Sequence, residues 1–287
     1  MAHDPLRTLL LDLHEALAGQ FSLIIAGGYG LYLKHQLIRD SGTRTLFSED
    51  KLPTSRTTED IDLFLKTEVV IDDARMRAMR GALTALGMVP IESAKYYQFE
   101  KDVGFAGKVR IDLLMGPMGM LSDAKNLKMD SRRARARGFA ELHAHPVPEA
   151  IAVEDKLFPI RVSGELSDKT KTEVEIFIPQ AFSYLMMKLF AYRDRKNDDT
   201  KDYARHHALD IYRIVGLMTE KEYHDVLELS KVHRENEKVR EARKIVGEFF
   251  TAQTGDGVLS AKAHKLYSSK LDIDGFLKVL AELFPPL

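Results

Sequence analysis

The sequence contains no cysteine and no long hydrophobic segment. Without cysteine, the chain of 287 residues forms neither disulfide bonds nor thiolate metal sites. The apolar residues 9–13 are interrupted by Asp12, whereas a membrane-spanning helix needs roughly 20 apolar residues. No signal-peptide pattern precedes this segment. We therefore expect a cytoplasmic protein without a membrane-spanning segment.

A large net charge is also absent. The formal net charge is −1, so any contact with nucleic acid must come from a local basic patch rather than from the whole surface. Internal repeats and low-complexity segments are missing as well. A chain of this length buries a large core and is typical of two domains.

Two aspartates stand close together in the segment 56–65, Arg-Thr-Thr-Glu-Asp-Ile-Asp-Leu-Phe-Leu. Its apolar end predicts a β-strand, and side chains on a strand alternate between two faces. Asp60 and Asp62 therefore share one face, and Ile61 and Leu63 share the other. Neighbouring carboxylates repel each other and lose hydration on burial, so the pattern favours a site for a hard divalent cation. The alternative is a surface pair at a strand end, but aspartate is rare in strands.

A glycine turn lies upstream of the aspartates. An apolar strand at 22–26 leads into Gly-Gly-Tyr-Gly and then into a helical pattern. Such a turn exposes backbone N–H groups at a helix N-terminus, where a phosphate binds. The dinucleotide-binding fingerprint does not fit, because Leu33 stands at its third glycine position. Gly27 and Gly28 are therefore candidate phosphate-binding residues.

A third carboxylate completes the set. Residues 108–115 alternate as a half-buried strand does, which puts Asp112 on its polar face. Residues 96–100 and the glycine-containing turn that follows them predict a hairpin partner for this strand. If Asp112 lies across the sheet from the two upstream aspartates, the three carboxylates can hold two magnesium ions at roughly 4 Å separation.

These three motifs, in this order, resemble the DNA polymerase β-like nucleotidyltransferase superfamily. The matching residues are Gly27-Gly28, Asp60-Ile61-Asp62-Leu63 and Arg110-Ile111-Asp112. The resemblance implies an α+β fold, with a nucleotidyltransferase-type mixed sheet flanked by helices and followed by an α-helical C-terminal domain. It also implies two Mg²⁺ ions held by Asp60, Asp62 and Asp112. Arg56 is assigned to nucleotide binding together with Gly27 and Gly28.

Within the superfamily, the chain is most similar to the AbiEii/AbiGii-type toxin family, up to about residue 215. That family carries a lysine in a Lys-Leu-x-Ala helix and a later acidic residue. Lys188 fits the first position, and either Asp202 or Asp210 fits the second, with Asp210 preferred. The resemblance implies that Lys188 and Asp210 act in catalysis and that Lys188 also binds the nucleotide. The serine that usually follows the family's first glycine is replaced here by Gly28.

Helical periodicity alone gives Lys188 another interpretation. At about 100° per residue, Lys188 lies off the apolar stripe of its helix and on the side of Tyr184 and Arg195. A solvated polar face explains this position without any ligand. Only the family resemblance favours the other interpretation, in which Lys188 binds the triphosphate of a nucleotide.

The hydrophobic pattern divides the chain near Pro179. Residues 1–179 are predicted to form the nucleotidyltransferase core domain with an extra β segment, and residues 180–287 a helical domain. Two helices are predicted in the first half, at 4–18 and 72–86, with Gly81 interrupting the second and Gly87 ending it. Further strands are predicted at four segments: 139–144, 149–153, 158–162 and 173–178.

A basic segment lies between residues 121 and 138. Its arginines are Arg132, Arg133, Arg135 and Arg137. Such a run is usually a solvated loop, but in a relative of enzymes that act on RNA it is also a candidate contact with the RNA backbone. Nearby, His143 and His145 share a strand face. Without a third ligand for zinc, two exposed histidines are the simpler prediction.

The function that these features predict is magnesium-dependent nucleotidyl transfer, the movement of an NMP from an NTP to an acceptor hydroxyl. The family resemblance implies a tRNA 3′ end as the acceptor, a toxin role and an antitoxin protein as partner. Transfer to a small antibiotic-like molecule or to a protein hydroxyl is one alternative. A non-catalytic nucleotide-binding protein is another, although the three retained aspartates argue against it.

Overall fold

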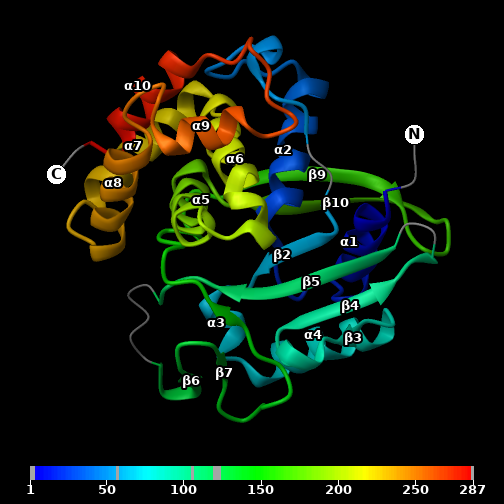
Figure 1. Ribbon diagram of the computed structural model, residues 1–287. Helices are drawn as coiled ribbons and strands as arrows, with labels where there is room; N and C mark the ends of the chain where they lie inside the picture. Colours follow the sequence, from blue (N-terminus) through cyan, green and yellow to red (C-terminus); the bar gives the residue numbers. More distant parts are fainter. Residues whose placement is uncertain (1–3, 56–57, 105–106, 119–123, 286–287) are drawn as a thin grey trace. The chain divides into compact units, whose positions relative to one another are not determined.

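A computed structural model describes residues 4–55, 58–104, 107–118 and 124–285 of the chain (Figure 1). The fold class is α+β, as the sequence predicts. Ten α-helices and a mixed sheet of parallel and antiparallel strands lie within the described residues. No helix in these ranges is long and apolar enough to cross a membrane.

The chain divides into two compact units. Unit 1 comprises residues 1–33, 57–147 and 157–179, and unit 2 comprises residues 34–56, 148–156 and 180–287. One crossing between the units falls after Pro179, where the sequence analysis puts the domain boundary. Unit 2 also includes residues 34–56 and 148–156, which come before Pro179 in the sequence.

Unit 1 contains an eight-stranded sheet. Seven strands lie in the order β3-β4-β5-β2-β1-β10-β9, and β8 pairs with β5. The strands are β1 (Ile24–Ala26), β2 (Asp60–Phe64), β3 (Val89–Pro90), β4 (Gln98–Asp102), β5 (Lys108–Met115), β8 (His145–Pro146), β9 (Phe158–Glu165) and β10 (Lys171–Ile178). A separate two-stranded ribbon consists of β6 (Leu127–Met129) and β7 (Ala134–Ala136).

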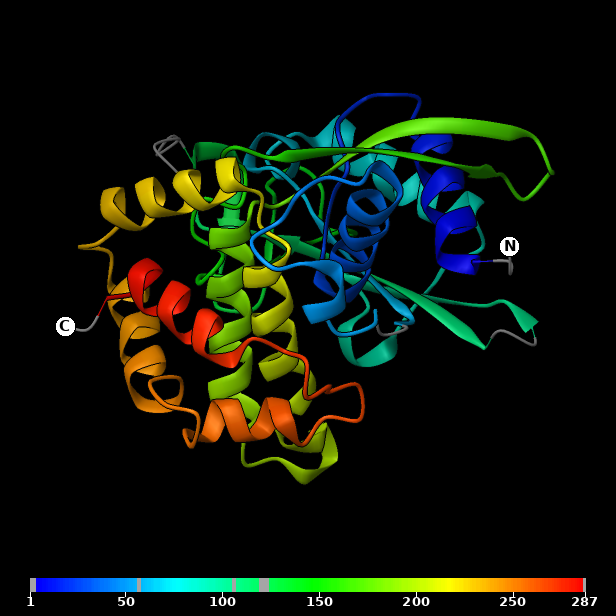
Figure 2. The ribbon, with the colours of Figure 1, turned by 90° about the horizontal axis from the view of Figure 1, so that it is seen from above.

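Unit 1 also contains α-helices, two of which begin at a capping aspartate. They are α1 (Pro5–Ala16), α3 (Thr67–Val70), α4 (Asp73–Ala85) and the first part of α2 (Gly27–Ser41), with 3-10 helices at Glu92–Ala94 and Ala124–Asn126. The side chains of Asp4 and Asp72 accept N–H groups of the first turns of α1 and α4. α1 lies beside the long β9–β10 hairpin (Figure 2), where Arg7 and Thr8 donate to backbone carbonyls of β9.

The central strands separate an apolar face of the sheet from a polar one. Along β5 the buried residues alternate with more exposed ones, as the sequence predicts. β4 pairs with β5 in antiparallel fashion, which confirms the predicted hairpin. The guanidinium of Arg80 in α4 lies 5.2 Å from the ring of Phe99, the partner of Ile111. α4 therefore covers the apolar face, and Asp112 belongs to the opposite face.

Unit 2 is mainly helical. Its helices are the second part of α2, α5 (Ala181–Arg195), α6 (Arg205–Gly216), α7 (Glu220–Val232), α8 (Glu237–Phe249), α9 (Asp256–Lys262) and α10 (Ile273–Leu283), with 3-10 helices at Glu49–Lys51 and Asp199–Ala204. α5, α6 and α8 each bury a set of apolar side chains. Aromatic contacts join these helices to α10 and to the chain after it, for example Tyr212 with Phe276 at 5.3 Å and Phe182 with Phe284 at 5.9 Å.

Three local predictions are wrong. Gly81 lies inside α4 and does not interrupt it. Residues 139–144 and 149–153 are turns and loops with buried apolar side chains, not strands. Short apolar runs indicate burial, and burial alone does not require a hydrogen-bonded strand. The other two predicted strands are confirmed, because residues 158–162 and 173–178 lie in β9 and β10.

Candidate active site

Asp60, Asp62 and Asp112 lie on one face of the unit 1 sheet. β2 and β5 run parallel, with Asp62 opposite Asp112 and Asp60 opposite Arg110. Paired residues on neighbouring strands point to the same face, as do residues two apart on one strand. All three carboxylate side chains are half-buried, whereas Ile61, between the two β2 aspartates, is fully buried. The predicted alternation therefore brings the three carboxylates together on adjacent strands.

The carboxyl of Asp112 is strongly affected by its neighbours. Burial, followed by the charge of Asp62, raises the pKa of Asp112 from its usual 3.8 to about 6. The charge of Asp60 adds to this rise, while a hydrogen bond from Gln98 and the charge of Arg110 oppose it. The cluster of carboxylates is therefore costly at neutral pH unless a cation balances it.

The nearest cations on β5 are already paired. Arg110 lies 3.5 Å from one carboxylate oxygen of Glu100, and Lys108 binds the other at 2.5 Å. Glu100 is the β4 residue opposite Arg110, so it draws both cations along the sheet. Both cations of β5 therefore pair with Glu100, although the charge of Arg110 also lowers the pKa of Asp112.

The chemistry of the three aspartates suits a hard divalent cation, because carboxylate oxygens are ligands that Mg²⁺ prefers. Oδ2 of Asp112 accepts a hydrogen bond from Nε2 of Gln98 at 3.0 Å. Oδ1 is buried and has no hydrogen-bond partner among the described residues, an arrangement that costs free energy unless something binds there. Within the same ranges, no three His, Cys, Asp or Glu side chains form a complete metal cage. A coordination sphere shared by the three aspartates therefore stays a prediction.

Gly27 contacts the carboxylate of Asp62 directly. β1 ends at Ala26, the partner of Asp62, and α2 begins at Gly27 with a φ of +63°. A Cβ atom on Gly27 would lie only 1.8 Å from Oδ2 of Asp62. The predicted order of strand, glycine turn and helix is confirmed. Because the first N–H groups of a helix lack partners within the helix, donors for an anion lie beside the aspartates.

In unit 2, Lys188 is buried and ion-paired, so the interpretation of a solvated polar face is wrong. Its side chain is 9% exposed, and its ammonium lies 2.8 Å from Oδ2 of Asp210. Oδ1 of Asp210 lies 3.2 Å from Nη1 of Arg213. Tyr184, on the same side of α5, is buried as well. Burial of such charged groups costs desolvation free energy, which the ion pairs with Asp210 offset in part.

The structure separates the two acidic candidates of unit 2. Asp202 is exposed and pairs with Arg205 at 3.1 Å. It begins a run of three residues with positive φ, continued by Tyr203 and Ala204. Asp210, in contrast, contacts the buried lysine. This contact supports the preference for Asp210.

The environment of His143 differs from the sequence expectation. His143 is buried rather than exposed, stacks on Tyr96 with 4.4 Å between ring centroids, and its Nε2 lies 3.1 Å from the carbonyl oxygen of Ala140. His145 is half-buried and stacks on Tyr97 at 5.2 Å. Aromatic stacking, which polarity does not predict, removes His143 from solvent.

The basic run belongs to the β6–β7 ribbon of unit 1. Its side chains are exposed for Arg132, Arg133 and Arg137 and half-buried for Arg135. Asp130 closes the ribbon by accepting the backbone N–H groups of Arg132 and Arg133. The guanidinium of Arg133 lies 5.2 Å from the ring of Tyr96, just before β4. The ribbon thus contacts Tyr96, which lies just before β4, and β4 pairs with β5.

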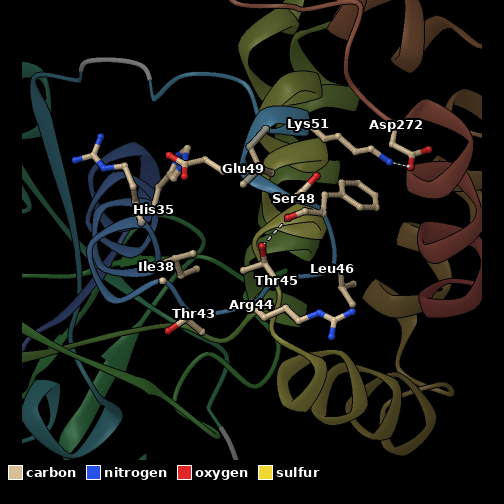
Figure 3. A pocket seen from close by; sticks show the side chains of 14 residues that line it. His35, Ile38, Thr43, Arg44, Thr45, Leu46, Ser48, Glu49, Lys51 and Asp272 are labelled. Carbon is tan, nitrogen blue, oxygen red and sulfur yellow. Dashed lines mark hydrogen bonds and ion pairs between the residues drawn. The ribbon is translucent and has the colours of Figure 1, made fainter.

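Unit 2 contains a cavity of about 500 Å³ that the sequence analysis did not predict (Figure 3). Its charged lining residues are Arg39, Arg44, Glu49, Lys51 and Asp272. Lys51 and Asp272 pair at 2.9 Å. On the wall, Nδ1 of His35 lies 2.9 Å from Oγ of Ser55, and burial followed by the charge of Arg213 lowers the pKa of His35 to about 4. The lining mixes both charges and favours no single class of ligand.

The sequence analysis did not identify two residues that contact predicted site residues, namely Gln98 and Arg213. Gln98 could have been found by counting the register of the β4–β5 hairpin back from Asp112. Arg213 could have been found from its position three residues after Asp210 on the same helix. Arg56, a predicted nucleotide-binding residue, lies outside the described residues.

No protein-family model matches this chain, and no curated protein matches it.

We expect Gly27→Ala to destabilise the protein by roughly 2 kcal/mol or more, because the new methyl group would both strain the backbone and displace the Asp62 carboxylate. Gly19→Ala is the matched control. Gly19 also has a positive φ, but a Cβ atom there meets nothing within 4 Å, so we expect a loss of about 1 kcal/mol. Urea unfolding measures both values. Equal losses would contradict the contact with Asp62.

The raised pKa of Asp112 makes the metal-free protein less stable as pH rises. A carboxyl whose pKa is higher in the folded state stabilises that state fully below pH 4, and this stabilisation is lost as pH rises through about 6. After allowance for solvent screening, we expect a loss of about 1–2 kcal/mol that Asp112→Asn does not undergo. Urea unfolding in EDTA between pH 4.5 and 7.5 compares the two proteins. Parallel pH profiles would refute the shifted pKa.

Proposed function

We propose that this chain is a magnesium-dependent nucleotidyltransferase of the DNA polymerase β-like superfamily, which moves an NMP from an NTP to an acceptor hydroxyl. One observation carries the proposal. Three aspartates share a sheet face on two parallel strands, and a glycine at the start of a helix touches one of them. Such a cluster costs stability, so cation binding explains it better than folding does. The mixed sheet and the helical C-terminal half are compatible with this superfamily.

Asp60, Asp62 and Asp112 are the residues that would hold two magnesium ions. When bound, magnesium neutralises the phosphate charge and makes the acceptor hydroxyl more acidic. The N–H groups of Gly27 and Gly28 bind phosphate oxygens at the start of α2. The absence of a side chain on Gly27 lets the phosphates approach the aspartates closely.

Asp112 also accepts the proton of the acceptor hydroxyl. A carboxylate within hydrogen-bond reach of the acceptor hydroxyl can act as its general base. The acceptor oxygen forms a bond to the α-phosphorus, the bond from that phosphorus to the bridging oxygen breaks, and pyrophosphate leaves. Positioning and charge neutralisation are sufficient for this reaction, so no covalent intermediate is needed.

Two residues of unit 2 belong to the proposal because the AbiEii/AbiGii-type resemblance implies them. By that resemblance, Lys188 is the cation for the nucleotide, and the ion pair with Asp210 at 2.8 Å orients its ammonium. Arg213 fixes the other oxygen of Asp210. We therefore expect replacement of Lys188 or Asp210 to reduce transfer strongly.

For the acceptor, we favour RNA, such as a tRNA 3′ end, with the chain acting as the toxin of a toxin–antitoxin pair. The exposed arginines of the β6–β7 ribbon support this choice, because they offer charge to a phosphate backbone. A cationic small molecule would need an acidic pocket. Unit 1 has a hollow whose acidic lining residues are Glu68, Asp72 and Asp73, but Arg137 lines it as well, and Arg75 lies 3.7 Å from the carboxylates of Glu68 and Asp72.

Transfer is tested with each labelled NTP and total tRNA, with and without magnesium, and with a small aminoglycoside as a second acceptor. Asp60→Ala or Asp62→Ala should reduce transfer by roughly a thousandfold or more, since several kcal/mol of charge stabilisation are lost. Both variants should stay folded without magnesium, because one of two repelling charges is removed. Asp155→Ala, an exposed aspartate, is the control. Wild-type transfer by the Asp60/Asp62 double variant would refute the proposal.

RNA binding should weaken steeply with salt, because phosphate contacts release counterions. Replacement of all four arginines of the basic run by glutamine should reduce the salt slope by roughly 3.6, at about 0.9 for each of the four lost contacts. A control replaces four exposed cations of unit 2, namely Lys231, Arg234, Arg240 and Lys244. Filter binding at several salt concentrations measures the slopes. An unchanged slope in the arginine variant would identify the run as a solvated loop and favour a small acceptor.

A further inference from the structure

Gln98 holds one oxygen of Asp112 by a neutral hydrogen bond. The two residues are direct partners in the antiparallel β4–β5 pair, so their side chains point to the same face of the sheet. Nε2 of Gln98 donates to Oδ2 of Asp112 at 3.0 Å. Only the amide nitrogen can donate to a carboxylate, and this fixes the orientation of the amide.

The position of Gln98 is itself fixed by its surroundings. The carbonyl of the preceding Tyr97 accepts the backbone N–H of Leu113, and the ring of Tyr97 stacks on His145 of β8. The carbonyl oxygen of Gln98 itself accepts a hydrogen bond from the backbone N–H of Ile91. The amide group of Gln98 therefore projects from a backbone that is bonded on both sides.

The two oxygens of Asp112 are consequently not equivalent. Oδ2 is occupied by Gln98, whereas Oδ1 is buried and lacks a hydrogen-bond partner within the described residues. A neutral donor leaves the negative charge of the carboxylate intact. A lysine or arginine in place of Gln98 would neutralise this charge and compete with a cation for it.

We propose that Gln98 is a positioning residue, which turns Asp112 so that Oδ1 faces the magnesium site while its charge is retained. This inference rests on the proposed function, because it concerns the ion that the three aspartates would hold. Hydrogen bonds to ligating carboxylates typically contribute 10–100-fold to metal affinity, and we expect an effect of this size here.

The test is magnesium binding to the full chain, measured by titration calorimetry with MgCl₂ and without nucleotide. Gln98→Met keeps the length of the side chain but removes the donor, and it should weaken magnesium binding by 10–100-fold. Gln98→Lys should weaken it further, because the new charge pairs with Asp112. Gln253→Met is the matched control, since Gln253 donates to Asp274 at 2.8 Å in unit 2.

Transfer kinetics separate positioning from a merely structural role. In Gln98→Met, the magnesium concentration for half-maximal transfer should rise 10–100-fold, while kcat at saturating magnesium should change much less. Wild-type magnesium affinity in folded Gln98→Met would overturn the role of Gln98 and leave the proposed function standing. A wild-type protein that binds no magnesium and transfers no nucleotide would overturn both.

Discussion

The parallel pairing of β2 with β5 is the constraint on which the candidate site depends. Its register puts Asp62 opposite Asp112, and the two-residue period of β2 adds Asp60 to the same face. A slip of one residue would turn Asp112 into the core beside Ile61. The apolar residues behind the aspartates, packed under α4, therefore fix the register, and this register assembles the carboxylates.

Three residues beside this cluster carry no positive charge. Gly27 contributes no side chain, Gln98 contributes a neutral amide, and Glu100 engages the two cations of β5. None of these three residues brings a positive charge of its own to the carboxylates, whereas Arg110 lowers the pKa of Asp112. Burial, followed by the like charges of the other two aspartates, raises the pKa of Asp112.

Sequence patterns predicted the parts of this site that depend on periodicity. Alternation was sufficient for β2, β5 and the β4–β5 hairpin, and the glycine turn identified the start of α2. Sequence patterns did not predict the burial of two polar side chains, because contacts with distant residues cause that burial. Lys188 is buried through its ion pair with Asp210, and His143 is buried through stacking on Tyr96. Both depend on residues distant in sequence, as does the contact between Gly27 and Asp62, and no local pattern encodes them.

The partly protonated carboxyl of Asp112 couples cations to protons. Near pH 6 this group carries a proton about half of the time, and an ion that binds to its oxygen must displace that proton. The heat of ion uptake would then contain the ionisation heat of the buffer that takes up the proton. Two buffers with different ionisation enthalpies would give different apparent heats at pH 6 and converging heats at pH 8. The burial of Asp112 would thus be detected as a difference in the apparent heat of ion binding between two buffers.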